Sequence, residues 1–372
     1  MSRANPKPVP PSAEAELLAW PRYRDNLARH LIGVARELQL RLMSHLVTEC
    51  DHRDLRPSFG LLISLVASAP RPLTRLAREL AISPQAASQL VGLAERAGYL
   101  GREPNPADRR TAWLVLTPAG ERLVRDGIES LRAIEAEHAR RIGGDDYPRF
   151  LAALAKLVGS LELFPRPRAA ESGSAGLLPI LAAHVEQDLM RATGQRGHTG
   201  LKLSHGQILT LIGPSGARLH RLAELHGVSR QAISATARDL EAQGYLQREA
   251  DPTDRRGVVV RLTGRGRRLI EDSVAALDDL ERDWRKRIDA DEFEVFARVA
   301  RRLYGALELE TTLLSDAFAN DARRRDDADP IDADPELALA RLAAQLRDRL
   351  GARDAARLAA HLSPATAEVS QP

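Results

Sequence analysis

The hexapeptide N-P-A-D-R-R at residues 105–110 recurs 146 positions later as D-P-T-D-R-R at residues 251–256. Each copy follows a G-Y-L-x-R-E segment and precedes a short apolar run that ends in L-T-x-x-G. At this offset Leu73–Leu123 aligns with Leu219–Leu269 without a gap, and about 23 of the 51 positions are identical. The chain is therefore expected to contain one domain twice.

The alignment continues more weakly in both directions, pairing His52 with His198 and Phe150 with Phe296. Each copy then has an ordinary domain size. Composition sets the remaining boundaries, because a Pro-, Gly- and Ser-rich linker and a charged spacer flank copy two. The predicted order is a partly disordered segment (1–26), a first domain (27–163), a linker (164–176), a second domain (177–316), a flexible spacer (317–335) and an amphipathic C-terminal helix (336–362).

Apolar spacing predicts that each copy is mainly helical. In copy one we expect helices over 27–46, 59–67, 73–80, 83–96, 118–142 and 147–163, and strands over 99–103 and 112–117. Ser83 can cap the fourth helix, Pro84 suits its first position, and Gly98 ends it. The third and fourth helices form a helix-turn-helix. Copy two repeats this plan, with Ser229 as the cap and Gly244 as the stop.

The repeated hexapeptide lies between the two predicted strands, so it is expected at the tip of a hairpin, or wing. A thin hairpin that ends in arginines can enter the minor groove of DNA, whose negative potential favours guanidinium groups. The predicted contacts are Arg109, Arg110, Arg255 and Arg256, with Asp108 and Asp254 holding them in position. The alternative is a solvated surface turn, which two copies in identical surroundings do not favour.

The pattern S-x-Q-A-x-S, G-Y-L-x-R-E, D-R-R, L-T-x-x-G resembles the winged helix-turn-helix of MarR-type bacterial transcriptional regulators. The resemblance covers residues 27–163 and 177–316. It implies a mainly α fold with two winged helix-turn-helix domains, each with flanking dimerisation helices and a two-stranded wing. It also implies double-stranded DNA as the partner and a small aromatic ligand between the lobes. Because this chain carries both domains covalently, we expect them to pair within one chain.

The fourth helix is the recognition helix of the helix-turn-helix, and outward positions near its start are expected to face base edges. Glutamine suits adenine and arginine suits guanine, while serine contacts bases or phosphates. These positions are Gln85, Ser88 and Gln89 in copy one, and Arg230, Gln231, Ser234 and Arg238 in copy two. The residues expected to pack inward are Ala86, Leu90 and Leu93, with Ala232, Ile233 and Leu240 in copy two. Any single polar residue here is equally consistent with a solvated helix surface.

Bulk composition predicts a cytoplasmic protein and permits a nucleic-acid partner without requiring one. The 372 residues have a formal net charge of +3, and Cys50 is the single cysteine, so no intrachain disulfide can form. No segment reads as a signal peptide or a membrane span. Leu73–Leu123 has seven arginines against five acidic residues, a net of +2, and Leu219–Leu269 has ten against six, a net of +4. Copy two is therefore expected to contribute more to phosphate neutralisation.

No signature of catalysis is present, and neither an enzyme nor a cofactor is expected. His45, Cys50 and His52 lie close together in sequence, which raises the alternative of a metal site or a redox sensor at Cys50. A small buried cysteine beside surface histidines is the simpler interpretation, and no metal is expected. The predicted function is sequence-specific DNA binding that represses transcription. The alternatives are an architectural DNA-binding protein without an effector and a protein-interaction scaffold.

Overall fold

The structure is a computed structural model that describes residues 13–80, 82–105, 111–143, 145–163, 174–213, 216–219, 230–250 and 258–309. The chain divides into two compact units. The smaller unit holds the described residues between 37 and 138, and the larger unit holds residues 13–36 together with the described residues from 139 to 309. The predicted spacer and C-terminal helix lie outside the described residues.

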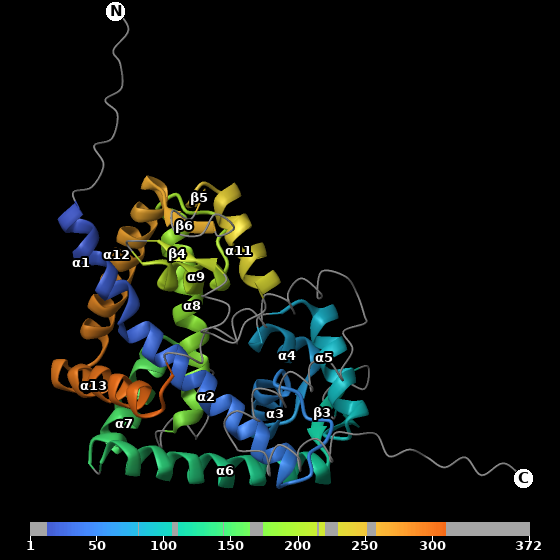
Figure 1. Cartoon of the computed structure of the whole chain (residues 1–372). Coiled ribbons are helices and arrows are strands. Elements are labelled where there is room, and N and C mark those ends of the chain that lie inside the picture. The colour runs from blue at the N-terminus through green and yellow to red at the C-terminus, as the bar shows by residue number, and fades with distance from the viewer. Residues whose placement is uncertain are drawn as a thin grey trace, which may run out of the picture. The chain divides into compact units, whose positions relative to one another are not determined.

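The smaller unit is the winged lobe of copy one (Figure 1). Its elements are the end of α2 (Leu27–Thr48), then α3 (Phe59–Ser68), β1 (Arg71–Pro72), α4 (Leu73–Glu79), α5 (Pro84–Arg96), β2 (Leu100–Pro104), β3 (Ala112–Leu116) and most of α6 (Pro118–Ile142). The sheet has the order β1-β3-β2 and is antiparallel. The wing hairpin therefore carries a third strand, which the expectation of a two-stranded wing omitted.

Local chemistry fixes the ends of the recognition helix α5 as the sequence predicts. The Ser83 hydroxyl accepts a hydrogen bond from the amide of Ala86 at 3.1 Å, and Pro84 occupies the first turn. Gly98 has a φ of 79° and Gly244 a φ of 78°, the left-handed conformation that ends helices at glycine. Ser229 lies outside the described residues.

The larger unit contains the winged lobe of copy two together with the closing helices of both copies. Copy two contributes η2 (Ala175–Leu177), α8 (Leu178–Gln195), α9 (Leu203–Ile212), β4 (Ala217–Arg218), α11 (Arg230–Ala242), β5 (Leu246–Ala250), β6 (Val258–Leu262), α12 (Gly264–Arg287) and α13 (Ala290–Ala306). Its sheet has the matching order β4-β6-β5. All three strands, and α11, lie 146 positions after their counterparts in copy one.

The closing helices α7 (Asp146–Ser160) and α13 pack against each other inside the larger unit (Figure 1). The ring of Phe150 stacks on that of its counterpart Phe296, with centroids 5.1 Å apart. Polar contacts across this pair are reciprocal. Arg141 donates to the carbonyl of Ala306 at 3.3 Å, and its counterpart Arg287 donates to the carbonyl of Ser160, the counterpart of Ala306, at 3.0 Å.

The acidic residues near the start of both helices repeat this reciprocity. Asp146 pairs with Arg302 at 3.7 Å. Their counterparts, Glu292 and Lys156, also form an ion pair. In both pairs, the same two positions meet, once from each copy. A two-fold arrangement of two copies produces such reciprocal contacts.

A helix that the sequence did not predict, α1 (Ala13–Arg24), packs along α12 in the larger unit. Trp20 is 7% exposed and joins the apolar core of the copy-two winged lobe, beside Ile208 and Ile270. Arg22 forms ion pairs with Asp278 at 3.3 Å and Glu281 at 2.7 Å. The segment that precedes copy one therefore contributes to the core of copy two.

The repeated L-T-x-x-G motif joins the wing to the long helix that follows. Thr117 caps α6 by accepting the amide of Gly120 at 3.1 Å, and its hydroxyl donates to the carbonyl of Gly98 at 2.5 Å. A Cβ atom on Gly120 would lie 2.2 Å from the carbonyl oxygen of Tyr99. Gly266 has the same relation to Tyr245, again at 2.2 Å. Both positions therefore require glycine because of a close backbone approach.

Candidate nucleic-acid interface

The recognition helix α5 presents its predicted contact residues to solvent. Gln85, Ser88 and Gln89 are all exposed. The prediction of the inward face is wrong by one position. Ala86, Leu90 and Leu93 were expected to be buried, but they are only partly buried. The fully buried side chains of this helix are Ala87, Val91 and Ala94. Each lies one position after its predicted residue, and this face packs against the rest of the lobe.

In copy two, α11 buries the matching positions Ile233, Ala237 and Leu240, with Thr236 beside them. Ile233 and Leu240 were expected inside, whereas Ala232 is partly buried. Gln231 and Arg238 are exposed and Ser234 is half-buried. Arg230 is the first residue of this helix, and its side chain lies outside the described part.

An ion-pair cluster holds α11 against the start of α9. Asp239 accepts from Lys202 at 2.5 Å, Gln243 at 3.0 Å and His205 at 3.1 Å. Burial alone would raise the pKa of Asp239, but these hydrogen bonds and the neighbouring positive charges lower it to about 2. The counterpart of Asp239 in copy one is Leu93, so only copy two is anchored in this way.

The base of each wing is tied to its recognition helix by a repeated ion pair. Arg102 in β2 meets Glu95 of α5 at 2.6 Å, and Arg248 in β5 meets Glu241 of α11 at 2.7 Å. These pairs are solvent-accessible and contribute little to stability, but they fix the direction of the hairpin. The tip residues Asp108, Arg109, Arg110, Asp254, Arg255 and Arg256 lie outside the described residues.

A buried histidine braces each winged lobe, and reasoning from the sequence missed its role. His52 contacts Asp126 of α6 through Nε2 at 2.8 Å and the Tyr99 hydroxyl through Nδ1 at 3.5 Å. In copy two, His198 contacts Asp272 of α12 at 2.8 Å and Tyr245 at 3.2 Å. Burial, with the charges of Asp54 and Asp51, raises the pKa of Tyr99 to about 12. All three residues recur at the offset of 146, and that signal could have identified the brace.

The environment of Cys50 does not favour a reactive thiol. Burial raises the pKa of its thiol, and the nearby carboxylates of Asp126, Glu49 and Glu129 raise it further. A redox sensor needs the opposite shift, because the thiolate is the reactive form. His52, its neighbour in sequence, is engaged with Asp126 and Tyr99. Among the described residues, no group of three or more His, Cys, Asp and Glu side chains could hold a metal ion.

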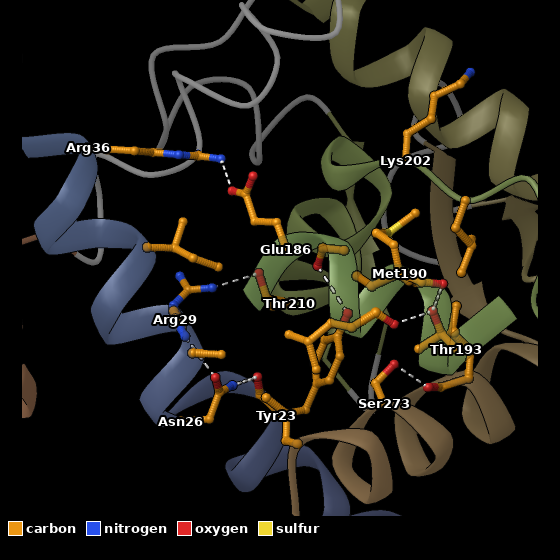
Figure 2. A pocket seen from close by; sticks show the side chains of 18 residues that line it. Tyr23, Asn26, Arg29, Arg36, Glu186, Met190, Thr193, Lys202, Thr210 and Ser273 are labelled. Carbon is orange, nitrogen blue, oxygen red and sulfur yellow. Dashed lines mark hydrogen bonds and ion pairs between the residues drawn. The ribbon is translucent and has the colours of Figure 1, made fainter. Parts of the chain in front are cut away.

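A cavity of about 180 Å³ opens beside the winged lobe of copy two (Figure 2). One wall comes from the N-terminal part of the chain, through Tyr23 of α1, Asn26, and Arg29 and Arg36 of α2. The opposite wall comes from α8, α9 and α12. Most of the lining is apolar, including Ile32, Leu189, Met190, Leu209, Leu269 and Leu277.

Comparison with known proteins identifies the same two segments. A sequence profile of the MarR family matches residues 56–111 and 199–257. A curated relative, the "Uncharacterized HTH-type transcriptional regulator YwhA" of Bacillus subtilis (strain 168), is 30% identical over 80 residues, which make up 22% of this chain and 58% of the relative. This chain thus matches little more than half the length of that relative.

Solved structures of similar fold include the crystal structure of MarR, which is 27% identical. That match covers 36% of this chain and 95% of the other, with a TM-score of 0.31. The MepR-DNA complex of S. aureus is 21% identical over 29% of this chain and 86% of the other, with a TM-score of 0.25. Within the described part of the chain, no helix is both long and apolar enough to cross a membrane.

Proposed function

We propose that this chain, whose two winged segments both match the sequence profile of the MarR family, binds a specific site on double-stranded DNA and represses transcription there. The observation that carries this proposal is the exposed polar face of the recognition helices, formed by Gln85, Ser88, Gln89, Gln231 and Arg238. The arginine-rich hexapeptides follow at the expected wing tips. A bound chain would repress by blocking access of the polymerase to the promoter.

One chain supplies both DNA-binding lobes in this proposal, as a pseudo-dimer. The reciprocal contacts between α7 and α13 support it, because stacked counterparts such as Phe150 and Phe296 are expected where two copies face each other across a pseudo-two-fold axis. The 13 linker residues at 164–176 keep the copies at a high effective concentration. Pairing within the chain therefore outcompetes pairing between chains at ordinary protein concentrations.

The DNA site in this proposal is an imperfect inverted repeat, because the recognition helices differ. Pro84 becomes Arg230, Gln89 becomes Ala235 and Gly92 becomes Arg238 at the matching positions. Proline and glycine offer no side-chain hydrogen bond to a base, whereas arginine pairs with guanine. The half-site under copy two therefore prefers guanine more strongly, and its binding depends more on salt.

Control by a small ligand is the last part of the proposal. The cavity beside the copy-two lobe supports it, since 180 Å³ exceeds the roughly 150 Å³ known to admit benzene. A ligand that fits one arrangement of the lobe better than another would shift the DNA-binding equilibrium. Small-ligand control also separates a regulator from an architectural DNA-binding protein.

Selection from a random DNA pool tests the proposal. We expect recovery of a site with two unequal halves, whose centres lie roughly 10 base pairs apart, and a complex of one chain per site in analytical ultracentrifugation. Equal affinity for selected and random DNA would favour an architectural protein instead. A minimum complex of two chains per short site would contradict the pseudo-dimer while leaving DNA binding intact.

A further inference from the structure

Helix α1 lies along α12 and covers an apolar face of the copy-two lobe (Figure 1). Trp20 of α1 joins the same apolar cluster as Leu262 of β6 and Ile270 of α12, which are 6% and 3% exposed. Two residues further on, Arg22 holds α1 in place through its ion pair with Asp278 at 3.3 Å. A helix from outside the winged fold therefore completes this side of the copy-two lobe.

The equivalent face of the copy-one lobe is exposed. At the offset of 146, the two residues beneath Trp20 become Leu116 and Val124, which are only partly buried. Ile128 of α6 is 46% exposed, the most of any large hydrophobic side chain among the described residues, whereas its counterpart Val274 is partly buried. Copy one thus repeats the apolar face that α1 covers in copy two, without the same cover.

A leucine-bearing segment of this chain is available for that face. The counterpart of Trp20 is Arg166 in the predicted linker, so the sequence before copy two does not repeat the tryptophan. Residues 336–362, which lie outside the described residues, instead have leucines at helical spacing, at positions 339, 342, 346 and 350. An amphipathic helix gains most of its stability by burying its apolar stripe against another element.

The charges beside the face and in this segment are both reversed relative to the α1 contact. Asp278, the partner of Arg22, is replaced in copy one by Arg132, an exposed residue of α6. Arg22 lies two residues after the buried tryptophan of α1, and Asp348 lies two residues after Leu346. Among the four leucines of the stripe, Leu346 alone is followed at this spacing by an acidic residue. A helix with Leu346 in the place of the tryptophan would therefore set Asp348 opposite Arg132.

The chain before this segment is long enough to let it dock within its own molecule. Residues 310–335 number 26, which span roughly 28 Å as a flexible coil and about 85 Å when fully extended. For comparison, the 25 residues of α6 form a helix roughly 38 Å long. Covalent linkage also favours docking within one chain over docking between two chains, because it raises the effective concentration of the segment.

From these observations we propose that residues 336–350 form a helix that docks on the exposed face of α6 in the same chain. Leu346 lies against Val124 and Ile128, and Asp348 pairs with Arg132. Each winged lobe is then covered by a helix from outside the winged fold, which is α1 on copy two and the C-terminal helix on copy one. This docking does not rest on the proposed function.

Disulfide trapping in the full chain tests the docking. In a Cys50→Ser background, Ile128→Cys and Leu346→Cys are introduced together and a mild oxidant is added. We expect an intrachain disulfide that forms roughly tenfold faster than in a control pair of Leu346→Cys with Ala133→Cys. Ala133 is an exposed residue of α6 that lies five positions further on, and therefore on another side of the helix. The mass of the unreduced product and peptide mapping distinguish intrachain from interchain disulfides.

Charge reversal tests the register of the docked helix. Arg132→Asp should slow trapping at Ile128 roughly two- to fivefold, as expected for loss of a solvent-exposed ion pair, and adding Asp348→Arg should restore the rate. A rate that stays low in the double variant would contradict the pairing of Arg132 with Asp348. Equal trapping at Ile128 and Ala133, or none at either position, would overturn the docking. A disulfide between two chains would show that a second copy covers the face instead. Circular dichroism establishes that each variant retains its fold, and no step requires DNA.

Discussion

Gly120 fills a position that no other residue can take without moving the backbone. A Cβ atom there would lie 2.2 Å from the carbonyl oxygen of Tyr99, which the start of the wing holds in place. We predict that Gly120→Ala lowers the free energy of unfolding by roughly 3 kcal/mol. Gly127 lies in the same helix with open space around its Cα, so Gly127→Ala should raise stability by roughly 0.5–1 kcal/mol. Urea unfolding compares the two, and equal effects would show that the close approach is absent.

The wing-tip arginines are the other residues whose individual effects we predict. If Arg110 and Arg256 reach a groove, each alanine substitution should weaken binding to the selected DNA site by roughly 1–3 kcal/mol. Titration of labelled DNA at fixed salt measures this loss. Glu103→Ala in β2, an exposed residue below the tip, serves as a control for the hairpin itself. Unchanged affinity in both arginine variants would remove the wing from recognition.

Arg238 of α11 is exposed beside the buried Ala237 and has glycine as its counterpart. Since arginine pairs with guanine in the major groove, Arg238→Ala should relax the guanine preference of one half-site by roughly 1–3 kcal/mol. The other half-site should be unaffected. Repeating the selection from random DNA with the variant measures this change. A symmetric site before and after the substitution would mean that this position does not face the bases.

The cluster around Asp239 makes the attachment of α11 sensitive to acid. The pKa of this carboxyl in the folded chain, about 2, lies below its ordinary value of 3.8, so its stabilising effect is complete above about pH 4 and is lost as pH falls towards 2. We predict that Asp239→Asn costs roughly 1–2 kcal/mol at neutral pH. That difference from the unsubstituted protein should shrink below pH 4. A difference that stays constant down to pH 3 would contradict the assignment.

Most element positions could be predicted because their signals are local. The Ser83-Pro84 pair predicted the start of α5, and Gly98 its end, close to where the structure has them. Apolar spacing predicted the positions of α2, α3 and α6. β1 and β4 escaped prediction because they are two residues long and form only through pairing with β3 and β6. The helix α1 escaped because it contains Pro21, and its contacts with α12 are distant in sequence. The cavity was unpredictable for the same reason, since its walls come from residues far apart along the chain.

Covalent linkage of the two copies predicts a distinctive unfolding behaviour. In a homodimer the paired state gains stability as protein concentration rises, because association is bimolecular. Here α7 and α13 belong to one chain, so the midpoint of thermal unfolding should not change over a hundredfold range of concentration. Differential scanning fluorimetry measures this directly. A midpoint that rises with concentration would indicate that pairing occurs between chains.

The reciprocal contacts of α7 and α13 also bear on how such a protein can change. In a homodimer every substitution at the interface appears twice, so a residue on the axis such as Phe150 must suit its own copy. In this chain Phe150 and Phe296 are encoded separately, and the ion pairs Asp146–Arg302 and Glu292–Lys156 already use different residues for equivalent contacts. A substitution in one copy can therefore occur while the equivalent residue in the other copy stays unchanged. The same freedom extends to the recognition helices, so under the proposed function the two halves of the DNA site can differ.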